Sequence, residues 1–285
     1  MADLPVGENL MDQLTTHVGP FSMTSAKGFL IDRDISGMSV AQFGSFNGKG
    51  PLTSSGVHGN GLICSRKAKN ANQMFWPDLL ITLLGFSHHR TYSKDFAKIY
   101  HFNETLGSAF FKHAMGKDSF TIGVTLGRPE SKGFMKLRDS NPFSPVIIDP
   151  KYLHEPNDLM ALIDGVKTTL ELVENTKAFK SVGAKLAKVT FPECEAFAFG
   201  TYKYWQCYVT HFTMSGNSIA GSCPMGQKGQ NDSVVDSELR VLGVDRLRVI
   251  DASVFPSMVS SPIQAAVMMI AEKGAELIQD FWFDI

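Results

Sequence analysis

The residues best suited to hold an electron-rich ligand lie near the C-terminal end of the sequence. The apolar run Leu247-Arg248-Val249-Ile250 predicts a buried strand, and Asp251-Ala252-Ser253 predict a tight turn at its end. Ser260-Ser261-Pro262 then predict a helix start, with a hydroxyl cap and proline in the first turn. Residues 262–271 carry no charge, so we expect the first half of this helix to be buried. Its unpaired N–H groups suit a phosphate, a carbonyl or an anionic ring, unless the serine cap alone satisfies them.

Longer segments around these residues follow the order of a known family. They are Leu4–Asp12, Gly127–Gly133, Asp149–Tyr152 with Asp158-Leu159, Val234–Val244, Arg248–Pro256 and Met269–Lys273. Together they resemble the glucose-methanol-choline (GMC) oxidoreductases, flavoenzymes that oxidise alcohols, and the sequence is most similar in character to arthropod members.

The resemblance implies an α/β fold in two parts. It places residues 17–208 in an α+β substrate-binding domain with a mostly antiparallel sheet and flanking helices. Residues 1–16 are then a remnant of the FAD-binding domain, and residues 209–285 supply its C-terminal strand and helix. The dinucleotide-binding half of that domain needs a strand, Gly-x-Gly-x-x-Gly and a helix. Gly56–Gly61 has the wrong spacing and Gly48-Lys49-Gly50 lacks the rest of a phosphate loop, so both predict turns, and we expect that half to be absent from this sequence.

The two catalytic positions implied by the resemblance carry unsuitable side chains. The histidine base of the family corresponds to Ser218, and its histidine or asparagine partner corresponds to Pro262. A serine hydroxyl does not take a proton from an alcohol near neutral pH, and proline has no side-chain donor or acceptor. His211 is the nearest histidine in sequence and is a weak candidate for a substitute base; the alternative is an ordinary, partly buried histidine.

The cofactor contacts implied by the resemblance depend less on side chains. Asp251 and Ala252 correspond to the contact with the ribityl-phosphate region of FAD, and Gln264 and Ala265 to the helix start that meets the flavin pyrimidine. Backbone N–H groups can serve there whatever the side chain. We do not expect this chain alone to bind FAD firmly, because the nucleotide-binding half is absent. The implied substrate is a small alcohol or sugar, and we expect self-association through the face that the absent half leaves exposed.

Composition sets few limits on the function. The 285 residues are 44% hydrophobic and 19% charged, which allows one large domain or two smaller ones. The net charge of -1 predicts neither a nucleic-acid nor an anionic-membrane partner. Leu79–Phe86 is a long uncharged apolar cluster, but it is far too short to span a membrane. Met1–Pro5 does not resemble a signal peptide, which leaves the compartment open, a secreted parent protein included. The sequons at Asn103 and Asn231 matter only in a secreted chain.

The cysteines show no metal-ligand spacing, so we predict no metal site. Cys194 and Cys207 flank an aromatic loop and are either a disulfide or two buried thiols. The aromatic residues between Phe191 and Trp205 form either part of the core or the lining of a ligand pocket.

Three local patterns complete the prediction. Phe120–Leu126 is typical of a strand. Residues Pro156 to Asp158 predict the start of a helix capped by Asn157. His88-His89-Arg90 predict a solvated loop, because adjacent residues on one element point to different faces.

Three functions therefore remain open. The first is a truncated, inactive form of an FAD-dependent alcohol or sugar oxidoreductase. The second is a non-catalytic relative that binds a ligand or a partner. The third is a divergent enzyme that uses His211 as its base.

Overall fold

The computed structural model describes residues 2–45, 48–227 and 231–283. The chain divides into two compact units. Unit 1 comprises Met1–Leu14, Leu126–Asp158 and Ser215–Ile285, and unit 2 comprises Thr15–Thr125 and Leu159–Met214. The chain thus passes between the units after Leu14, Thr125, Asp158 and Met214. The assignment of residues 1–16, 17–208 and 209–285 to flavin and substrate domains stays a prediction.

Unit 2 is built on a sheet with the strand order β2-β3-β4-β1-β7, in which β8 also pairs with β1. The strands are β1 (Leu14–Ser22), β2 (Val57–Ile63), β3 (Leu79–Leu84), β4 (Ser119–Leu126), β7 (Lys185–Leu186) and β8 (Thr213–Ser215). β2 and β3 are antiparallel, with a register that runs from Val57↔Leu84 to Ile63↔Leu79. Strand β4 confirms the strand predicted at Phe120–Leu126, and the mixed α/β fold with an antiparallel sheet is confirmed.

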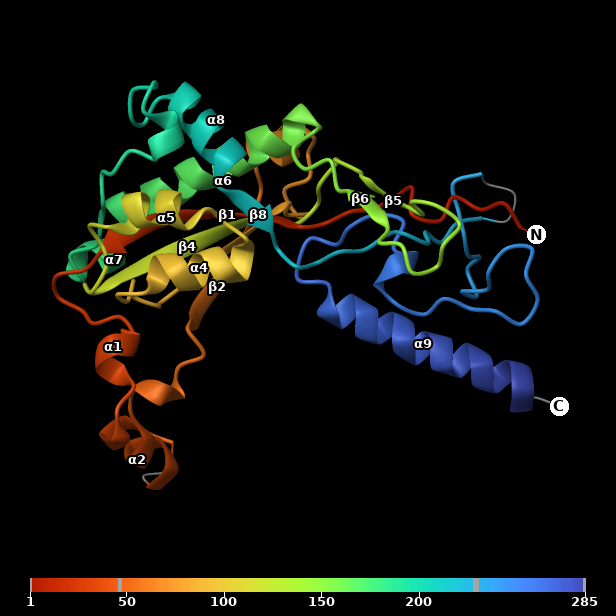
Figure 1. Cartoon of the computed structure of the whole chain (residues 1–285), viewed down its shortest axis with the longest axis horizontal. Coiled ribbons are helices and arrows are strands. Elements are labelled where there is room, and N and C mark those ends of the chain that lie inside the picture. Colours follow the sequence, from red (N-terminus) through yellow and green to blue (C-terminus); the bar gives the residue numbers. More distant parts are fainter. Residues whose placement is uncertain (1, 46–47, 228–230, 284–285) are drawn as a thin grey trace. The chain divides into compact units, whose positions relative to one another are not determined.

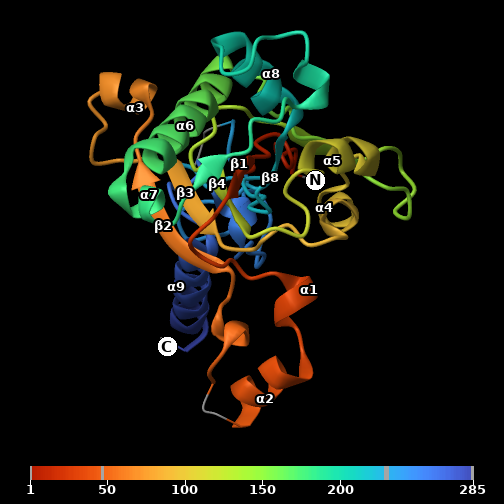
Figure 2. The same ribbon diagram turned by 90° about the vertical axis from the view of Figure 1, so that its left-hand side faces the viewer.

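Helices cover both faces of this sheet (Figure 2). The helices of unit 2 are α1 (Ile31–Asp34), α2 (Gly37–Ser45), α3 (Arg66–Asn70), α4 (Tyr92–Tyr100), α5 (Glu104–Phe111), α6 (Pro156–Asn175), α7 (Lys177–Ser181) and α8 (Tyr202–His211), with 3-10 turns η1 (Pro51–Thr53) and η2 (Pro192–Cys194). Of these, α1 and α2 lie away from the sheet (Figure 1). α6 approaches the sheet closely at Gly165, where an added Cβ would lie 2.4 Å from Val124 Cγ1. On the opposite face, Phe96 of α4 packs against His17 of β1.

The aromatic residues around α8 mostly belong to the core of unit 2. Phe191, Tyr204 and Trp205 are buried, whereas Phe197 and Tyr202 are exposed. The Tyr204 hydroxyl accepts a hydrogen bond from the Phe191 N–H. A disulfide joins Cys194 to Cys207 and ties η2 to α8.

Two sequence predictions for unit 2 are wrong. Residues His88 and His89 lie in a loop, but their side chains are buried rather than solvated. His88 is accommodated because its Nδ1 makes a hydrogen bond to Ser119 Oγ. Gly56–Gly61 is predicted as a turn, but all of it except Gly56 lies in β2, an edge strand in which Gly59 and Gly61 face open space. The turn predicted at Gly48-Lys49-Gly50 agrees with the positive φ of both glycines.

Unit 1 contains long irregular segments and one long helix (Figure 1). Its regular elements are the antiparallel pair β5 (Phe134–Lys136) and β6 (Ile147–Asp149), the 3-10 turn η3 (Ala252–Val254) and helix α9 (Gln264–Phe283). The buried core residues are Met11, Ala220, Val234, Val235, Leu239, Val254, Phe255, Met258 and Ile270. Backbone hydrogen bonds from Gly221, Cys223 and Met225 to residues 252–254 join two segments of this core.

The start of α6 also differs from the prediction. The helix begins at Pro156, one residue before the expected cap. Asn157 donates its side-chain N–H to Glu130 Oε2 instead of capping the helix. Asp158 accepts the backbone N–H groups of Glu130 and Ser131, so the first turn of the helix fixes the 130–131 segment.

The C-terminal segment differs most from its prediction. Leu247–Ile250 does not form a strand among the described residues; it makes a single bridge, Arg240↔Arg248, and Leu247 is 49% exposed. Helix α9 starts at Gln264, two residues after Pro262. Its uncharged first half is buried on one side only, since Ile270 is in the core but Met268 and Met269 are 59% and 63% exposed. The absence of charge in the first half of α9 indicates an apolar face, but it does not show whether another segment covers that face. No helix in the described part of the chain is both long and apolar enough to cross a membrane.

Candidate functional site

Ser218 lies in a buried hydrogen-bond network centred on Asp12. The backbone N–H of Ser218 donates to Asp12 Oδ1 at 3.0 Å. The other carboxylate oxygen, Oδ2, accepts from the Tyr152 hydroxyl at 2.6 Å and from Ser215 Oγ at 2.5 Å. Ser218 and Asp12 are both buried, and three donors satisfy the carboxylate. The network therefore holds the loop from Ser215 to Ser218 in one position.

Tyr152 acts in this network as a hydrogen-bond donor. Burial and, next, the hydrogen bond to Asp12 raise the pKa of Tyr152 to about 12. The phenol therefore stays protonated at neutral pH and continues to donate to the carboxylate.

Gln13, the next residue along the chain, anchors the loop that carries Pro262. Its Nε2 donates to the carbonyl oxygens of Gly127 at 3.1 Å, Val259 at 3.0 Å and Ser261 at 3.0 Å. An added Cβ on Gly127 would lie 2.5 Å from the Ser260 carbonyl oxygen. Only glycine therefore allows the loop to pack this closely.

Consecutive residues of one segment thus hold the two positions that the resemblance matches to the family's catalytic pair. Asp12 anchors the loop of Ser218, and Gln13 anchors the loop that leads to Pro262. Hydrogen bonds hold both loops in place, but the side chains at positions 218 and 262 supply little acid-base chemistry. The ionisable group next to Ser218 is Asp12, and both its oxygens already accept hydrogen bonds. Ser218 can donate or accept a hydrogen bond, and the Pro262 ring can do neither.

No role was assigned to Asp12 or Gln13 from the sequence alone. A usable signal was present, because two polar residues interrupt the apolar run Leu10-Met11-x-x-Leu14. Polar side chains at the start of a buried strand need hydrogen-bond partners. What the sequence could not supply is the identity of those partners, which lie more than 100 residues away in the chain.

The predicted cofactor residues lie at the turn before η3 and at the start of α9. Asp251 caps η3 and its Oδ1 accepts from the Ser253 N–H at 2.8 Å. The Ala252 carbonyl accepts from the Gly221 N–H, so the turn packs beside the segment that follows Ser218. Gln264 and Ala265 form the first turn of α9 and are exposed. Their N–H groups belong to the helix end whose donors lack intrahelical partners. Cofactor binding by these four residues stays a prediction.

His211 ends α8 in unit 2, whereas Ser218 belongs to unit 1. Its side chain is exposed rather than partly buried. It lines a shallow hollow of about 420 Å³ with Phe197, Lys203, Gln206, Cys207 and Thr210. A role for His211 as substitute base stays a prediction.

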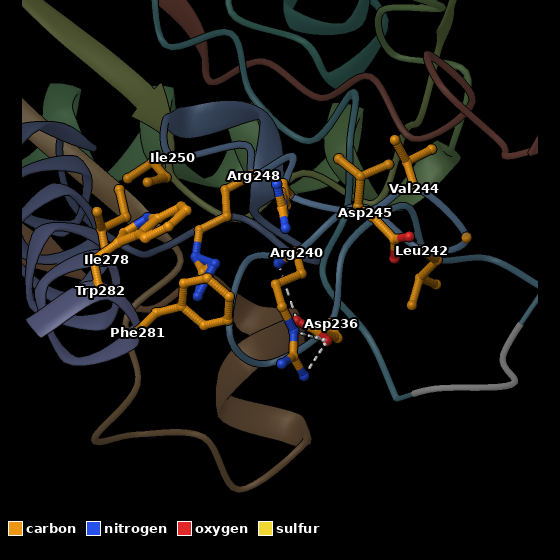
Figure 3. Close-up of a pocket in the computed structure, with 13 residues that line it drawn as sticks. Asp236, Arg240, Leu242, Val244, Asp245, Arg248, Ile250, Ile278, Phe281 and Trp282 are labelled. Atoms are coloured by element: carbon orange, nitrogen blue, oxygen red, sulfur yellow. Dashed lines mark hydrogen bonds and ion pairs between the residues drawn. The ribbon is translucent and has the colours of Figure 1, made fainter. Parts of the chain in front are cut away.

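A larger hollow of about 870 Å³ lies along the second half of α9 (Figure 3). Ile250, Ile278, Phe281 and Trp282 form its apolar side, and Arg248 reaches over the Phe281 ring at 5.8 Å from the centroid. On the polar side Arg240 pairs with Asp236 and Glu238. None of the predicted site residues lines this hollow. Arg240 and Asp236 pair with each other, Asp245 and Arg246 also line the hollow, and the Phe281 and Trp282 rings are exposed. This mixture suits a protein surface better than a small polar ligand.

No cluster of three or more metal-ligating side chains is found within the described ranges.

Comparisons with known proteins identify the same family that the sequence segments resemble. The family model for GMC oxidoreductase matches residues 129–271. The glucose dehydrogenase [FAD, quinone] of Drosophila melanogaster is 41% identical over 164 residues, which cover 58% of this chain and 26% of that protein. Human mitochondrial choline dehydrogenase is 33% identical over 163 residues, which cover 57% of this chain and 26% of the human protein.

Solved structures extend the similarity to the whole fold. A formate oxidase superposes with a TM-score of 0.74 at 23% identity, covering 98% of this chain and 48% of that chain. A fungal aryl-alcohol oxidase gives a TM-score of 0.67 at 18% identity, covering 98% of this chain and 49% of that chain. This chain therefore spans about half the length of the structures that it resembles.

Proposed function

The chain belongs to the GMC oxidoreductase family, and on that premise we propose that it is the C-terminal half of an FAD-dependent enzyme that oxidises the CH–OH group of a small alcohol or sugar. We propose further that this chain alone is inactive. The family match supports the first statement, and the anchored but chemically poor site carries the second. Asp12 and Gln13 hold the loops of Ser218 and Pro262, yet neither position offers a base.

The residues present suit one end of the cofactor. The N–H groups of the exposed residues Gln264 and Ala265 would meet the flavin ring, and the turn at Asp251 and Ala252 would lie near the ribityl-phosphate region. When bound, FAD supplies the acceptor for the hydride that leaves the substrate carbon. The phosphates and the adenosine would need the dinucleotide-binding half, so this chain alone would hold FAD weakly.

The missing base supports the proposal of inactivity. Alcohol oxidation needs a group that accepts the hydroxyl proton, and a general base contributes roughly 10²–10⁴-fold to the rate. Ser218 would hydrogen-bond a substrate hydroxyl without taking its proton, and Asp12 is already occupied by three donors.

The visible absorption spectrum tests this proposal most directly. The purified chain is incubated with FAD, freed of unbound cofactor, and then assayed with a panel of alcohols and sugars and an artificial electron acceptor. We expect a colourless protein without turnover. A flavin spectrum near one FAD per chain would refute weak binding, and turnover would refute inactivity. If turnover is seen and is lost in the His211→Ala variant, the divergent-enzyme alternative is correct.

A second candidate function is that of a binding module, and the exposed face of α9 favours it. Met268, Ala271, Ala275 and Trp282 are spaced at i, i+3, i+7 and i+14, which places them on one side of the helix. Met268 and Trp282 are 59% and 53% exposed. Trp282 also lines the larger hollow, so the apolar face continues into it. We propose that this face mediates self-association of the chain.

Sedimentation velocity tests the self-association. We expect the wild-type chain to form dimers or larger species and the Met268→Lys variant to shift toward the monomer. Met269→Lys is the matched control, because Met269 lies about 100° further round the helix, toward Lys273 and Glu276. A wild-type chain that is monomeric throughout the accessible concentrations would contradict the proposal.

A further inference from the structure

The sequon Asn103-Glu104-Thr105 is fully accessible in unit 2. Its three residues are exposed where α5 begins. Asn103 is the N-cap of that helix, and its Oδ1 accepts the Leu106 N–H at 3.1 Å. In the part of the chain that the structure describes, Asn103 Nδ2 makes no hydrogen bond. The two ends of the side-chain amide therefore have separate roles, because the oxygen caps the helix and the nitrogen is available.

The disulfide provides an independent observation that points to the secretory pathway. Cys194 and Cys207 are bonded in the same unit. Disulfides form and persist mainly in the endoplasmic reticulum and outside the cell. Oligosaccharides are attached to Asn-x-Ser/Thr sequons of chains that pass through that compartment.

From these two observations we infer that Asn103 carries an N-linked glycan. The inference is separate from the proposed redox function, since it depends only on unit 2. The donor is a lipid-linked oligosaccharide diphosphate. A bond forms between Asn103 Nδ2 and the anomeric carbon of the first sugar, the bond from that carbon to the phosphate oxygen breaks, and the lipid diphosphate leaves. Nδ2 loses one proton and keeps the other.

The folded structure accommodates this product without a change at the helix. Glycosylation leaves Oδ1 intact, so the hydrogen bond that caps α5 persists. The glycan extends from an exposed side chain into solvent. It also makes this end of α5 hydrophilic and unsuited to a protein contact.

The second sequon, Asn231-Asp232-Ser233, is in a different setting. Asn231 is exposed and lies at a hollow in unit 1 together with Pro5 and Pro256, but Ser233, the third residue of the sequon, is buried. In the sequon at Asn103 all three residues are exposed. We therefore assign the modification to Asn103 and not to Asn231.

The test uses the full chain, secreted from insect cells behind a cleavable leader. Its intact mass is measured before and after enzymatic removal of N-glycans, and the modified asparagine is located by peptide mass spectrometry. The Asn103→Asp variant removes the acceptor nitrogen but keeps a good N-cap. Thr105→Ala removes the sequon and leaves Asn103 in place, and Asn231→Asp is the matched control.

We expect one glycan on the wild-type chain and on Asn231→Asp, and none on Asn103→Asp or Thr105→Ala. The two unglycosylated variants should retain the wild-type circular dichroism spectrum, which separates loss of the glycan from loss of the fold. A secreted wild-type chain without a glycan on Asn103 overturns the inference, as does a glycan located only on Asn231.

Discussion

Two buried histidines should make the stability of unit 2 depend on pH. The His17 ring faces Phe96, Tyr100 and Phe212, and its Nδ1 has no hydrogen-bond partner among the described residues. Burial lowers the pKa of His17 from 6.5 to about 4. Burial and, to a lesser extent, the neighbouring histidines lower the pKa of His88 to about 3. Both side chains are therefore neutral in the folded chain at pH 5.

The sign of the effect follows from proton uptake on unfolding. Below pH 6.5 the unfolded histidines bind protons that the folded ones exclude, so the free energy of unfolding falls as the pH falls. The stabilisation is fully present above pH 6.5 and is lost progressively toward the folded pKa values. Between pH 7 and pH 5 the two pKa values give a loss of about 2 kcal/mol for each histidine, or roughly 4 kcal/mol together.

Urea unfolding followed by the fluorescence of the buried Trp205 measures this loss. The carboxylates with lowered pKa values, Asp34, Asp95 and Asp236, titrate below this pH window in both states. The His17→Phe variant replaces the imidazole by a phenyl ring, which suits the aromatic surroundings and cannot bind a proton. We expect the dependence on pH to fall by about half, to roughly 2 kcal/mol.

The His211→Phe variant is the control, because it makes the same replacement at an exposed histidine of the same unit. If His17→Phe shows the same loss between pH 7 and pH 5 as the wild-type chain, His17 is not neutral in the folded state. The assignment of the stability change to its burial would then be refuted.

Three further substitutions test the packing and the hydrogen bonds. Asp12→Ala leaves buried donors unpaired and should cost about 3 kcal/mol by urea unfolding, whereas Asp12→Asn should cost less. Replacing Cys194 and Cys207 by alanine opens a loop with a sequence separation of 13 and should cost about 3 kcal/mol by thermal melting; an unchanged melt would mean that the bond does not form. Gly165→Ala places a methyl group 2.4 Å from a β4 side chain and should cost about 1–3 kcal/mol, while Gly44→Ala, with open space around it, should cost nothing.

Local patterns in the sequence predicted the elements that depend on local chemistry. The β-rich run at Phe120–Leu126 forms β4 because apolar and β-branched residues pack on both faces of it. Family order predicted the mixed fold correctly, and the aromatic residues around Trp205 are mainly core. These features require little knowledge of distant partners.

The failures occur where a distant partner decides the outcome. His88 was expected in solvent, but Ser119 provides the hydrogen bond that allows its burial. Leu247–Ile250 has the composition of a buried strand, yet it lacks a continuous neighbouring strand among the described residues. Asn157 looked like a helix cap, but Glu130, from another part of the chain, takes its side-chain N–H. The composition of a segment sets its preferred secondary structure and exposure, and tertiary contacts decide whether the segment adopts them.

The difference between local composition and distant contacts also explains how the site can keep its backbone geometry although it lacks a catalytic base. The loops that carry Ser218 and Pro262 are fixed by Asp12 and Gln13 through a backbone N–H and backbone carbonyl groups. These contacts do not depend on the side chains at positions 218 and 262. Replacing a catalytic base there removes proton transfer but leaves every one of these hydrogen bonds in place. A chain of this family can therefore lose turnover and still present an ordered surface at which a ligand or a second protein binds.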